Sequence, residues 1–446
     1  MDPEQARSIF EQAISAAREA GIHDVEVLTG ERHHALTRFA NNAIHQNVAE
    51  TGRYISVRVL VDQRTARVTS NRLDRVGIQS TVEQAIALTR ASAPNPDLLP
   101  MFAPSPIPEV SRWRPATANA TAEHRGATVR DAIAIAKEMG QNAAGIYSTG
   151  ASFEALLNSS GVEAFYDESL AQFSITSMAA DSSGWAKASA GDCGAIDAVA
   201  LARAACEKAA RSANPKEAAP GKYVVVLEPA AVVDLVGQIF VDFSGTAIAE
   251  QRSFLSDRLG ETLFGENIDI ADDVQHPMQA GSPFDGEGVA RRRIDLVSKG
   301  RAAHVVHSRV SAAKTGVEPT GHGYPLPNDI GEAPANIVIA GGPTPLEEMI
   351  RTTKRGILVT RLWYIREVEP YEKIMTGMTR DGTFLIENGE IAHGLRNFRF
   401  NQSVVELLRR VESLGPSARA SGEESFDMVV PPMKVRDFQF TEVTRF

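Results

Sequence analysis

Hydrophobic positions recur with a helical period at the N-terminus and with a period of two in the segments that follow. The first helix is predicted to begin at a capping Asp2, to start with Pro3 and to carry an apolar face of Ile9, Phe10, Ile14 and Ala17. Four strand-like runs come next: HDVEVLTG, HHALTRFA, NAIHQNVAE and RYISVRVLVD. Turn residues at Asn41-Asn42 and Thr51-Gly52 separate them, so consecutive strands with short turns predict an antiparallel sheet.

Three further helices are predicted in the N-terminal half, at 74–92, 121–139 and 195–213. A proline-rich stretch at 94–117 indicates an extended surface loop. The strand-like residues 151–180 contain Asn-Ser-Ser-Gly at 158–161, which is a hairpin turn signal. The segment NPKEAAPGK (214–222) is the best linker candidate.

The C-terminal half is mostly strand-like, from YVVVLEP to LRNFRFNQ, with Asp381-Gly382 and Asn388-Gly389 where hairpin turns belong. A run at 302–310 that includes His304 and His307 is one of these expected strands. The stretch DLVGQIFVDFSG (234–245) predicts a short amphipathic helix with an apolar stripe of Val233, Val236, Ile239 and Phe240. The pattern predicts an α+β fold, with an N-terminal antiparallel sheet and helices over 1–215 and a β-rich domain over 222–446.

Composition adds limits on the class of protein. The chain has 446 residues, a net charge of -10 and two cysteines, Cys193 and Cys206. These features favour a protein of a reducing compartment and disfavour a disulfide scaffold or a non-specific grip on nucleic acid or an anionic membrane. The N-terminus does not resemble a signal peptide, and no apolar run reaches 18 residues, so we expect a cytoplasmic protein.

No residue pattern in the chain indicates a catalytic set. There is no HExxH or HExxxH motif, no G-x-S-x-G elbow and no phosphate-binding glycine loop. His304 and His307, and likewise His33 and His34, are expected to diverge on their strands. The acidic pairs Asp272-Asp273 and Asp285/Glu287 are expected in solvated loops, Ser244 has no histidine near it in sequence, and both cysteines are expected to be structural.

Five segments together resemble the TldD/PmbA family, formerly described as modulators of DNA gyrase. They are RFANNAIHQN (38–47), NSSG (158–161), GSPFDGEGVARRRIDLVSKG (281–300), PTGHG (319–323) and FLIENGEI (384–391). They occur in the order of the family and in a chain of its usual length. The resemblance implies a cytoplasmic heterodimer of a TldD-type and a TldE-type (PmbA) subunit, in which the TldD-type subunit carries HExxxH and a downstream cysteine as zinc ligands.

The resemblance places Gly237, Gln238 and Asp242 where that motif has histidine, glutamate and histidine. No histidine lies between His124 and His276, and no cysteine follows Cys206. Zinc needs about three protein donors and an open water position, which these residues do not supply. The chain therefore resembles the TldE-type subunit, with no catalytic or metal residue of its own and with zinc in the TldD-type partner.

The resemblance further implies an unfolded or leader peptide as the substrate, and neither nucleic acid nor membrane as a direct partner. Trp363 and Tyr364 are candidate anchors for the subunit interface, although they could equally belong to the core. Two alternative functions stay open: an independent hydrolase with an unrecognised site, and a regulator that binds DNA gyrase or another macromolecule.

Overall fold

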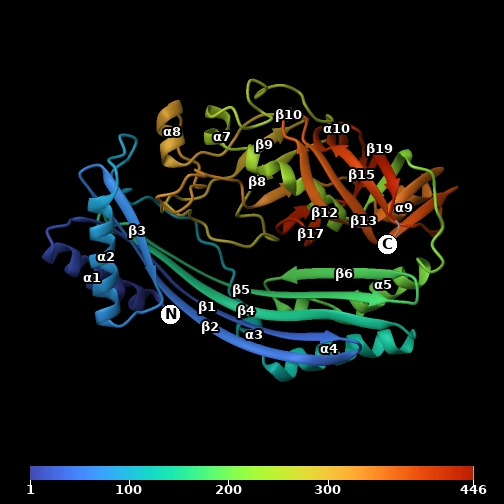
Figure 1. Cartoon of the computed structure of the whole chain (residues 1–446), viewed down its shortest axis with the longest axis horizontal. Coiled ribbons are helices and arrows are strands. Elements are labelled where there is room, and N and C mark those ends of the chain that lie inside the picture. Colours follow the sequence, from blue (N-terminus) through green and yellow to red (C-terminus); the bar gives the residue numbers. More distant parts are fainter. Residues whose placement is uncertain (445–446) are drawn as a thin grey trace.

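The computed structural model describes residues 1–444, whose strands form three sheets (Figure 1). The N-terminal sheet is antiparallel and has the order β3-β2-β1-β4-β5-β6. Its strands are β1 (Asp24–Ala40), β2 (Ala43–Val61), β3 (Arg64–Ser70), β4 (Asn142–Asn158), β5 (Glu163–Met178) and β6 (Ser183–Ala190). The fold class expected from the sequence, an α+β protein with an N-terminal antiparallel sheet, is confirmed.

Two pairs of helices cover the ends of one face of this sheet (Figure 1). Near one end, α1 (Pro3–Glu19) and α2 (Arg75–Ala91) pack on Val25, Val27 and Val57. Near the other end, α4 (Ala122–Glu138) and α5 (Ala198–Arg211) pack on Phe39 and Phe173. The short α3 (Pro115–Ala118) and the 3-10 turn η1 (Cys193–Ala195) lie between these elements in the chain. The side chains of β1 that alternate with these apolar ones point to the opposite face.

The helix starts follow the expected capping chemistry. Asp2 Oδ1 accepts a hydrogen bond from Gln5 N at 2.9 Å, with Pro3 as the first residue of α1. Asp74 Oδ1 accepts from Gly77 N at 2.7 Å and starts α2 in the same way. The helices expected at 74–92, 121–139 and 195–213 are therefore confirmed within a few residues.

The structure has two long strands where four were expected over 23–62. The prediction of a turn at Thr51-Gly52 is therefore wrong. His33 pairs with Thr51 and Arg32 pairs with Gly52 within one continuous β1–β2 ladder. The ladder supplies hydrogen bonds that outweigh the weak strand preference of Gly52. The turn at Asn41-Asn42 is confirmed, because both residues have positive φ, 51° and 57°, as a tight hairpin requires. The hairpin at 158–161 between β4 and β5 is confirmed as well.

Two sheets build the C-terminal half. One has the order β10-β9-β8-β11-β18-β17 and consists of β8 (Ile270–Asp272), β9 (Ile294–Ser298), β10 (Arg301–Ala302), β11 (Ile337–Ile339), β17 (Ala418–Ala420) and β18 (Met428–Val430). The other contains β7 (Gly221–Leu227), β12 (Arg355–Glu369), β13 (Ile374–Glu387), β14 (Glu390–Gly394), β15 (Phe398–Ser403), β16 (Val411–Leu414) and β19 (Met433–Val443). All strands of these two sheets lie within 221–443, and the domain division at 1–215 and 222–446 stays a prediction.

Five strands of the second sheet close into a ring. Each of β12, β7, β19, β15 and β13 pairs with the next, and β13 pairs again with β12. A closed ring leaves none of these strands as a free edge. Its core includes Phe398, Phe400, Phe438 and Phe440, with the rings of Phe398 and Phe440 4.7 Å apart.

Short helices complete the C-terminal half: α6 (Pro229–Val236), η2 (Gly237–Asp242), α7 (Gly245–Ala249), α8 (Arg309–Thr315), α9 (Leu346–Arg351) and α10 (Val404–Arg409). The helix expected at 234–245 is thus the end of α6 continued by a 3-10 turn. Its stripe of Val233, Val236, Ile239 and Phe240 is buried, as expected. The prediction of a solvent-facing polar side is wrong, because Asp234 and Asp242 are also buried and Val241 is 66% exposed.

The strand expected at 302–310 is also wrong. Only Arg301–Ala302 forms β10, Val306 makes an isolated bridge with Ser244, and α8 begins at Arg309. Ser308 is the reason that the helix begins there, because its side chain caps α8 by accepting from Ser311 N at 3.2 Å. Among residues 1–444, no helix is long and apolar enough to cross a membrane.

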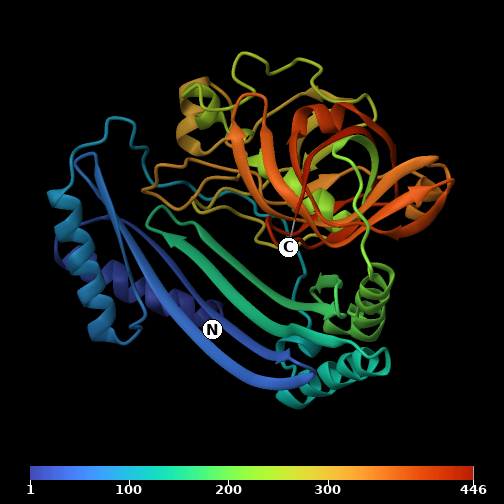
Figure 2. The ribbon, with the colours of Figure 1, turned by 45° about the vertical axis from the view of Figure 1, so that its right-hand side comes forward.

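The N-terminal sheet docks on the C-terminal half at both ends of its strands (Figure 2). At one end, Arg67 Nε donates to Leu326 O at 2.6 Å, and Arg309 Nη2 donates to Pro100 O at 2.7 Å. At the other end, Ser183 Oγ donates to Asp381 Oδ1 at 2.5 Å, and Lys208 Nζ lies 2.6 Å from Glu228 Oε2. The middle of the sheet face lies between these two docking points.

Candidate functional site

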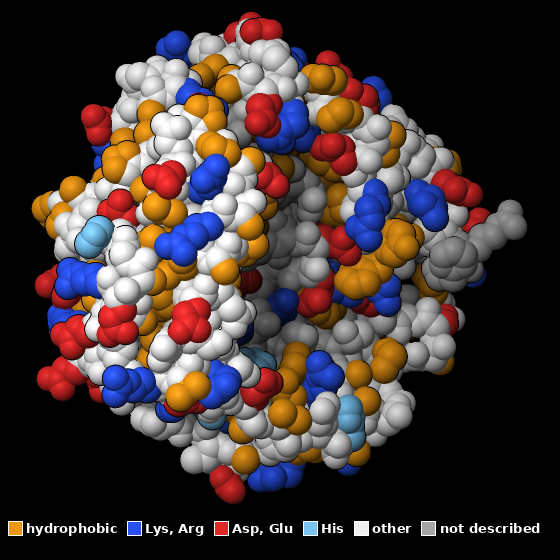
Figure 3. Space-filling model, turned by 60° about the vertical axis from the view of Figure 1, so that its left-hand side comes forward, with side chains coloured by type: hydrophobic (Ala, Val, Ile, Leu, Met, Phe, Trp, Pro, Cys, Tyr) orange, Lys and Arg blue, Asp and Glu red, His pale blue; other side chains and the backbone are white. Residues whose placement is uncertain are grey.

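The middle of the sheet face borders an open cavity. Arg32 and His34 from β1, Ser148 and Ser152 from β4, and Gln172 from β5 line a cavity of about 630 Å³. Gly52 and Gly150 also line it, and neither has a side chain to cover the strand backbone at its own position. Figure 3 shows a face of the molecule with a deep cleft that has acidic and basic side chains along its walls.

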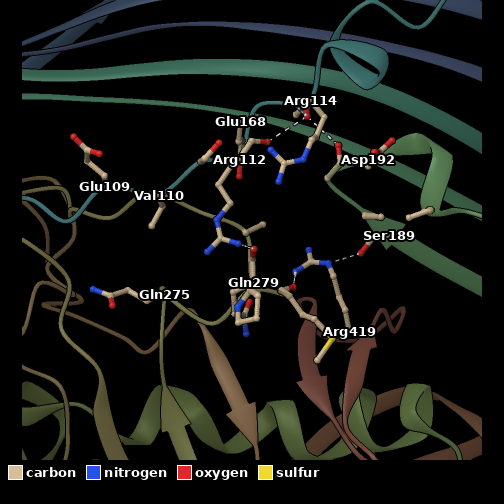
Figure 4. A pocket seen from close by; sticks show the side chains of 18 of the residues that line it. Glu109, Val110, Arg112, Arg114, Glu168, Ser189, Asp192, Gln275, Gln279 and Arg419 are labelled. Atoms are coloured by element: carbon tan, nitrogen blue, oxygen red, sulfur yellow. Dashed lines mark hydrogen bonds between the residues drawn. The ribbon is translucent and has the colours of Figure 1, made fainter.

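A second cavity, of about 740 Å³, lies between β5, β6, the extended segment 108–114 and the C-terminal loop 275–280 (Figure 4). Two arginines cross it in opposite directions. Arg112, from the N-terminal half, donates to the carbonyl oxygens of Gln279 and Val274. Arg419, on β17, donates from Nε to Ser189 Oγ at 3.0 Å on β6. These bonds connect the two halves across the cavity.

Among the described residues, Glu168 is the one that lines both cavities. Its Oε2 accepts from Tyr166 Oη at 2.7 Å and from Gly281 N at 3.0 Å. Burial, together with the Glu168 carboxylate, raises the pKa of the Tyr166 hydroxyl. The larger cavity carries acidic Glu109, Glu168 and Asp192 beside three arginines. A lining with both signs suits the amides and mixed side chains of a peptide better than a polyanion.

Residues 237 and 238, which the resemblance places at the family's motif, do not line either of these two cavities and pack against the segment 421–428. A Cβ atom on Gly237 would overlap Ser425 Oγ, and would lie 2.6 Å from Ser425 Cβ and 2.9 Å from Met428 Cε. Glycine at 237 is therefore required by packing, and a histidine side chain there has no room. Gln238 Nε2 donates to Asp234 O and to Glu424 O, both at 3.0 Å, so its amide holds the same segment.

Asp234 is the centre of this contact. Its Oδ1 accepts from Glu423 N at 2.8 Å and from Glu424 N at 2.9 Å, and its Oδ2 accepts from Leu362 N at 3.4 Å. The side chain is fully buried, and burial raises the pKa of its carboxyl to about 6. Sequence reasoning missed Asp234, and its place one helical turn before Gln238 is the only sequence signal for this role.

Asp242 points to a different cavity, of about 510 Å³, which Lys373 also lines. Lys373 Nζ lies 2.6 Å from Asp242 Oδ2 and 2.6 Å from Glu367 Oε2, and the side chains of Asp242 and Lys373 are each 4% exposed. Burial raises the pKa of the Asp242 carboxyl, and the ammonium of Lys373 opposes that effect. The structure therefore does not bring Gly237, Gln238 and Asp242 into one site. Sequence reasoning missed Lys373, which lies more than 130 positions along the chain from Asp242.

Two other acidic pairs are not the solvated loops that the sequence predicted. Asp272 is fully buried in β8 and lies 2.9 Å from His322 Nε2. Asp285 accepts from the backbone N–H groups of Glu287, Val289 and Gly323. Glu287 is 2% exposed, and burial with the nearby Asp285 raises its pKa to about 8. These carboxylates are buried because backbone amides, His322 and Arg309 offer partners.

The remaining sequence candidates do not assemble into a metal site. Within residues 1–444, no group of three or more His, Cys, Asp or Glu side chains is placed to hold a metal ion. Ser244 Oγ donates to Glu332 Oε1 at 2.8 Å, and His307 Nδ1 lies 3.3 Å from Ser311 Oγ. Cys193 and Cys206 are both buried and free.

The two candidate interface residues differ in environment. Trp363 is half-buried, with the guanidinium groups of Arg361 and Arg380 5.2 and 5.0 Å from its ring centre. Tyr364 is 58% exposed and has a positive φ of 60° in a β-bulge of β12. Glu424 Oε1 accepts its N–H at 2.9 Å. Their role at an interface stays a prediction.

Comparison with known proteins defines the class to which this fold belongs. Residues 25–89, 123–213 and 220–442 match the profiles described as PmbA/TldA metallopeptidase domain 1, central domain and C-terminal domain. The chain therefore belongs to the PmbA/TldD family, as the sequence segments indicated.

Particular relatives have the same descriptions. A metalloprotease of Methanothermobacter thermautotrophicus is 26% identical over 303 residues, which cover 62% of this chain and 64% of that protein. The metalloprotease PmbA of Escherichia coli O157:H7 is 24% identical over 50% of this chain and 47% of its own length. The chain thus spans about half to two thirds of these relatives. The crystal structure of TldE from Thermococcus kodakarensis has the same fold, with a TM-score of 0.89 at 21% identity over 97% of this chain and 100% of that one.

We predict that Gly237→Ala destabilises the protein by about 1–3 kcal/mol, because the added methyl group overlaps Ser425. Urea denaturation measures the loss. The double variant Gly237→Ala/Ser425→Gly should recover much of it, and Gly52→Ala, where a Cβ meets nothing within 4 Å, is the control. Equal effects at Gly237 and Gly52 would contradict the packing argument.

A second prediction concerns pH. The carboxyl of Asp234 has a folded-state pKa of about 6, above its ordinary value of 3.8, so its protonation stabilises the folded state. The stabilisation is present below about pH 4 and is lost as the pH rises through 6, by about 3 kcal/mol. Asp234→Asn, which keeps the acceptor for Glu423 N and Glu424 N, should remove this dependence. Unfolding free energies from pH 4 to 8 check it, and an unchanged slope in the variant would exclude Asp234 as its source.

The buried ion pair gives a third prediction. Lys373→Met leaves the Asp242 carboxylate buried without its cation, and should destabilise the protein by about 3–5 kcal/mol. Lys373→Met/Asp242→Asn removes the stranded charge and should be more stable than the single variant. A double variant no better than Lys373→Met alone, by the same denaturation measurement, would show that Asp242 tolerates isolation.

Proposed function

We propose that this chain is a non-catalytic TldE-type subunit of a heterodimeric zinc metallopeptidase. The TldD-type partner subunit holds the zinc and the catalytic carboxylate, and this chain forms part of the channel that holds an unfolded or leader peptide. The complex acts in the cytoplasm and uses neither nucleic acid nor a membrane as a direct partner. Family membership and the metalloprotease relatives support the class of activity.

One observation carries the non-catalytic assignment. Gly237, Gln238 and Asp242 each have a packing or pairing task in the folded chain, with Ser425, the backbone of Glu424 and Lys373 respectively. Ser425 and Met428 occupy the room that a metal ligand at 237 would need. A zinc ion would lack ligands there without rebuilding of both segments.

The two cavities that share Glu168 support the role in the channel. The walls of the larger cavity come from both halves of the chain, those of the smaller cavity come, among residues 1–444, from the N-terminal half alone, and Glu168 lines both. Both cavities carry charges of both signs, and Gly52 and Gly150 line the smaller one. We infer that the second subunit closes these open cavities, so that the complex excludes folded proteins and orients an extended chain toward a reactive centre of that subunit.

The hydrolase alternative would need a reactive nucleophile. Ser311 lies near a histidine, but its hydroxyl is hydrogen-bonded to a carboxylate. Ser311 Oγ, the hydroxyl close to His307, also donates to Glu332 Oε2 at 3.1 Å. The gyrase alternative rests on the former family description, and the acidic net charge of -10 disfavours a role through DNA.

We predict that the isolated chain binds far less than one zinc per molecule and leaves an unfolded peptide intact. Mixed with the HExxxH-bearing subunit of the same genome, it should co-elute with that subunit, and the mixture should cut the peptide. Gln238→Ala and Asp242→Asn in this chain should keep at least about half of the activity, because both side chains bind other groups of this chain. Metal analysis, size-exclusion chromatography and peptide mass spectrometry supply the measurements.

Changing the HExxxH motif of the partner is the matched control, and it should abolish cleavage. One tightly held zinc per isolated chain would overturn the assignment and favour the hydrolase alternative. So would loss of cleavage in Gln238→Ala or Asp242→Asn while the heterodimer still forms. Co-purification with a topoisomerase and no peptidase subunit would favour the regulator.

A further inference from the structure

Strand β2 is longer than the strand that covers its outer edge. It spans Ala43–Val61, but β3 pairs only with Ile55–Val61. Residues 43–54 pair with β1 on one side, and within residues 1–444 no strand pairs with their other side. All side chains from Ala43 to Arg53 are exposed. This uncovered length of β2, residues 43–54, is called the step below.

The opposite edge of the same sheet has a similar overhang, but that overhang is covered. Strand β6 pairs with β5 only from Ala171 onward. Before that point, Arg112 bridges Glu168, and Ser169 N donates to Arg112 O at 3.2 Å. Phe102, Ile107 and Val110 of the same extended segment pack on the apolar cluster around Tyr166. The step on β2 is therefore an overhang of this sheet that, unlike the one on β5, no neighbouring segment covers within residues 1–444.

The sequence of the step offers little protection against pairing. Natural edge strands carry lysine, proline or bulges that discourage a further strand. Residues 43–54 contain no lysine and no proline, and a single register shift lies near the hairpin, where Gln46 pairs with Arg38 and Ile44 with Phe39. From Gln46 to Tyr54 the ladder is regular, so an outer row of N–H and C=O groups is available to another strand.

The shape of the step fits a second copy of itself. Its ends are the hairpin turn Asn41-Asn42 and the start of β3 pairing at Ile55. In an antiparallel pairing with Val48 opposite Val48, the hairpin of each copy ends where β3 of the other begins. A pairing with Ala49 opposite Ala49 would place the hairpin of each copy against residues of β2 that already pair with β3. The pairing also places Gln46 opposite Glu50, whereas a centre at Glu50 would oppose two carboxylates.

We propose that residues 43–54 pair antiparallel with the same residues of a second copy of this chain. The pairing joins two N-terminal sheets across a two-fold axis at Val48, as an isologous contact. Strand β2 lies on the side of the sheet away from the C-terminal sheets, which leaves the approach open (Figure 1). The proposal does not depend on the peptidase assignment, whose interface candidates Trp363 and Tyr364 lie on β12.

Cysteine cross-linking tests the register directly. Opposed residues at the centre of an antiparallel pair have Cα atoms about 4.5–5.5 Å apart, within the range of a disulfide. The native thiols Cys193 and Cys206 are buried. Under mild oxidation, Val48→Cys should form a covalent dimer at low protein concentration. The control is Val76→Cys on α2, a site that is 66% exposed and should give only background cross-linking.

Charge reversal tests the same contact without cross-linking. Val48 is 38% exposed, so Val48→Lys and Val48→Glu should fold, while each raises the dimer dissociation constant by about tenfold through like charges at the axis. Mixing the two variants should restore the dimer. Analytical ultracentrifugation of the purified full chain and of the mixture measures these constants, and circular dichroism confirms folding.

Two outcomes would overturn the proposal. One is a monomeric wild-type chain at concentrations well above those in the cross-linking assay. The other is a dimer that neither charge variant weakens. If Val48→Lys instead blocks binding to the metallopeptidase subunit while the chain alone is monomeric, the step serves that subunit, and the peptidase assignment survives. If the wild-type chain dimerises but does not bind the metallopeptidase subunit, the result would support pairing through the step and contradict the proposed role as a peptidase subunit.

Discussion

The arrangement of the two halves depends on a buried ion-pair cluster at one end of the N-terminal sheet. Glu26 Oε2 lies 2.9 Å from Arg58 Nη2, and Glu26 Oε1 lies 2.6 Å from Arg67 Nη2. Burial alone would raise the pKa of Glu26, but the charges of the two arginines outweigh it and hold the pKa below its usual range. Arg67 then donates onward to Leu326 O in the C-terminal half. Such a cluster contributes little net stability, yet it tolerates only one geometry, because a displaced member would leave a buried charge unpaired.

A second contact, between β6 and the C-terminal half, fixes the other end of the N-terminal sheet, so that the sheet is held at both ends. Arg361 and Asp381 form an ion pair whose side chains are 6% and 4% exposed, and Ser183 of β6 donates to the same aspartate. The Arg361 guanidinium also lies 4.8 Å from the ring centre of Trp185 on β6. A long sheet held at both ends keeps its central face at a set distance from the C-terminal half. The larger cavity, whose walls come from both halves, follows from that spacing.

Sequence patterns predicted the local features whose cause is local. Asn41-Asn42 is a turn because both residues tolerate positive φ, and Asp2 and Asp74 cap helices with atoms three residues away. The failures have distant causes. Thr51-Gly52 stays in a strand because β1 pairs with it, and Asp285 and Glu287 are buried because Gly323 and Arg309 reach them from later in the chain. Lys373 could not be connected with Asp242 from spacing, since a hairpin end and a 3-10 turn bring them together only in the fold.

Packing and pairing at positions 237 and 242 oppose the introduction of a metal ligand at either position alone. A histidine at 237 requires the space of Ser425 and Met428, and their segment is held by Asp234 and Gln238. A ligand at 242 requires Asp242 to release Lys373, whose ammonium would then face Glu367 alone. Each change removes a contact that positions another residue, so we expect a single substitution at either position to destabilise the chain. Packing between α6, η2 and the segment 421–428 therefore fixes Asp234, Gly237 and Gln238 as parts of one folded core, in which a change at one position disturbs the contacts of the others.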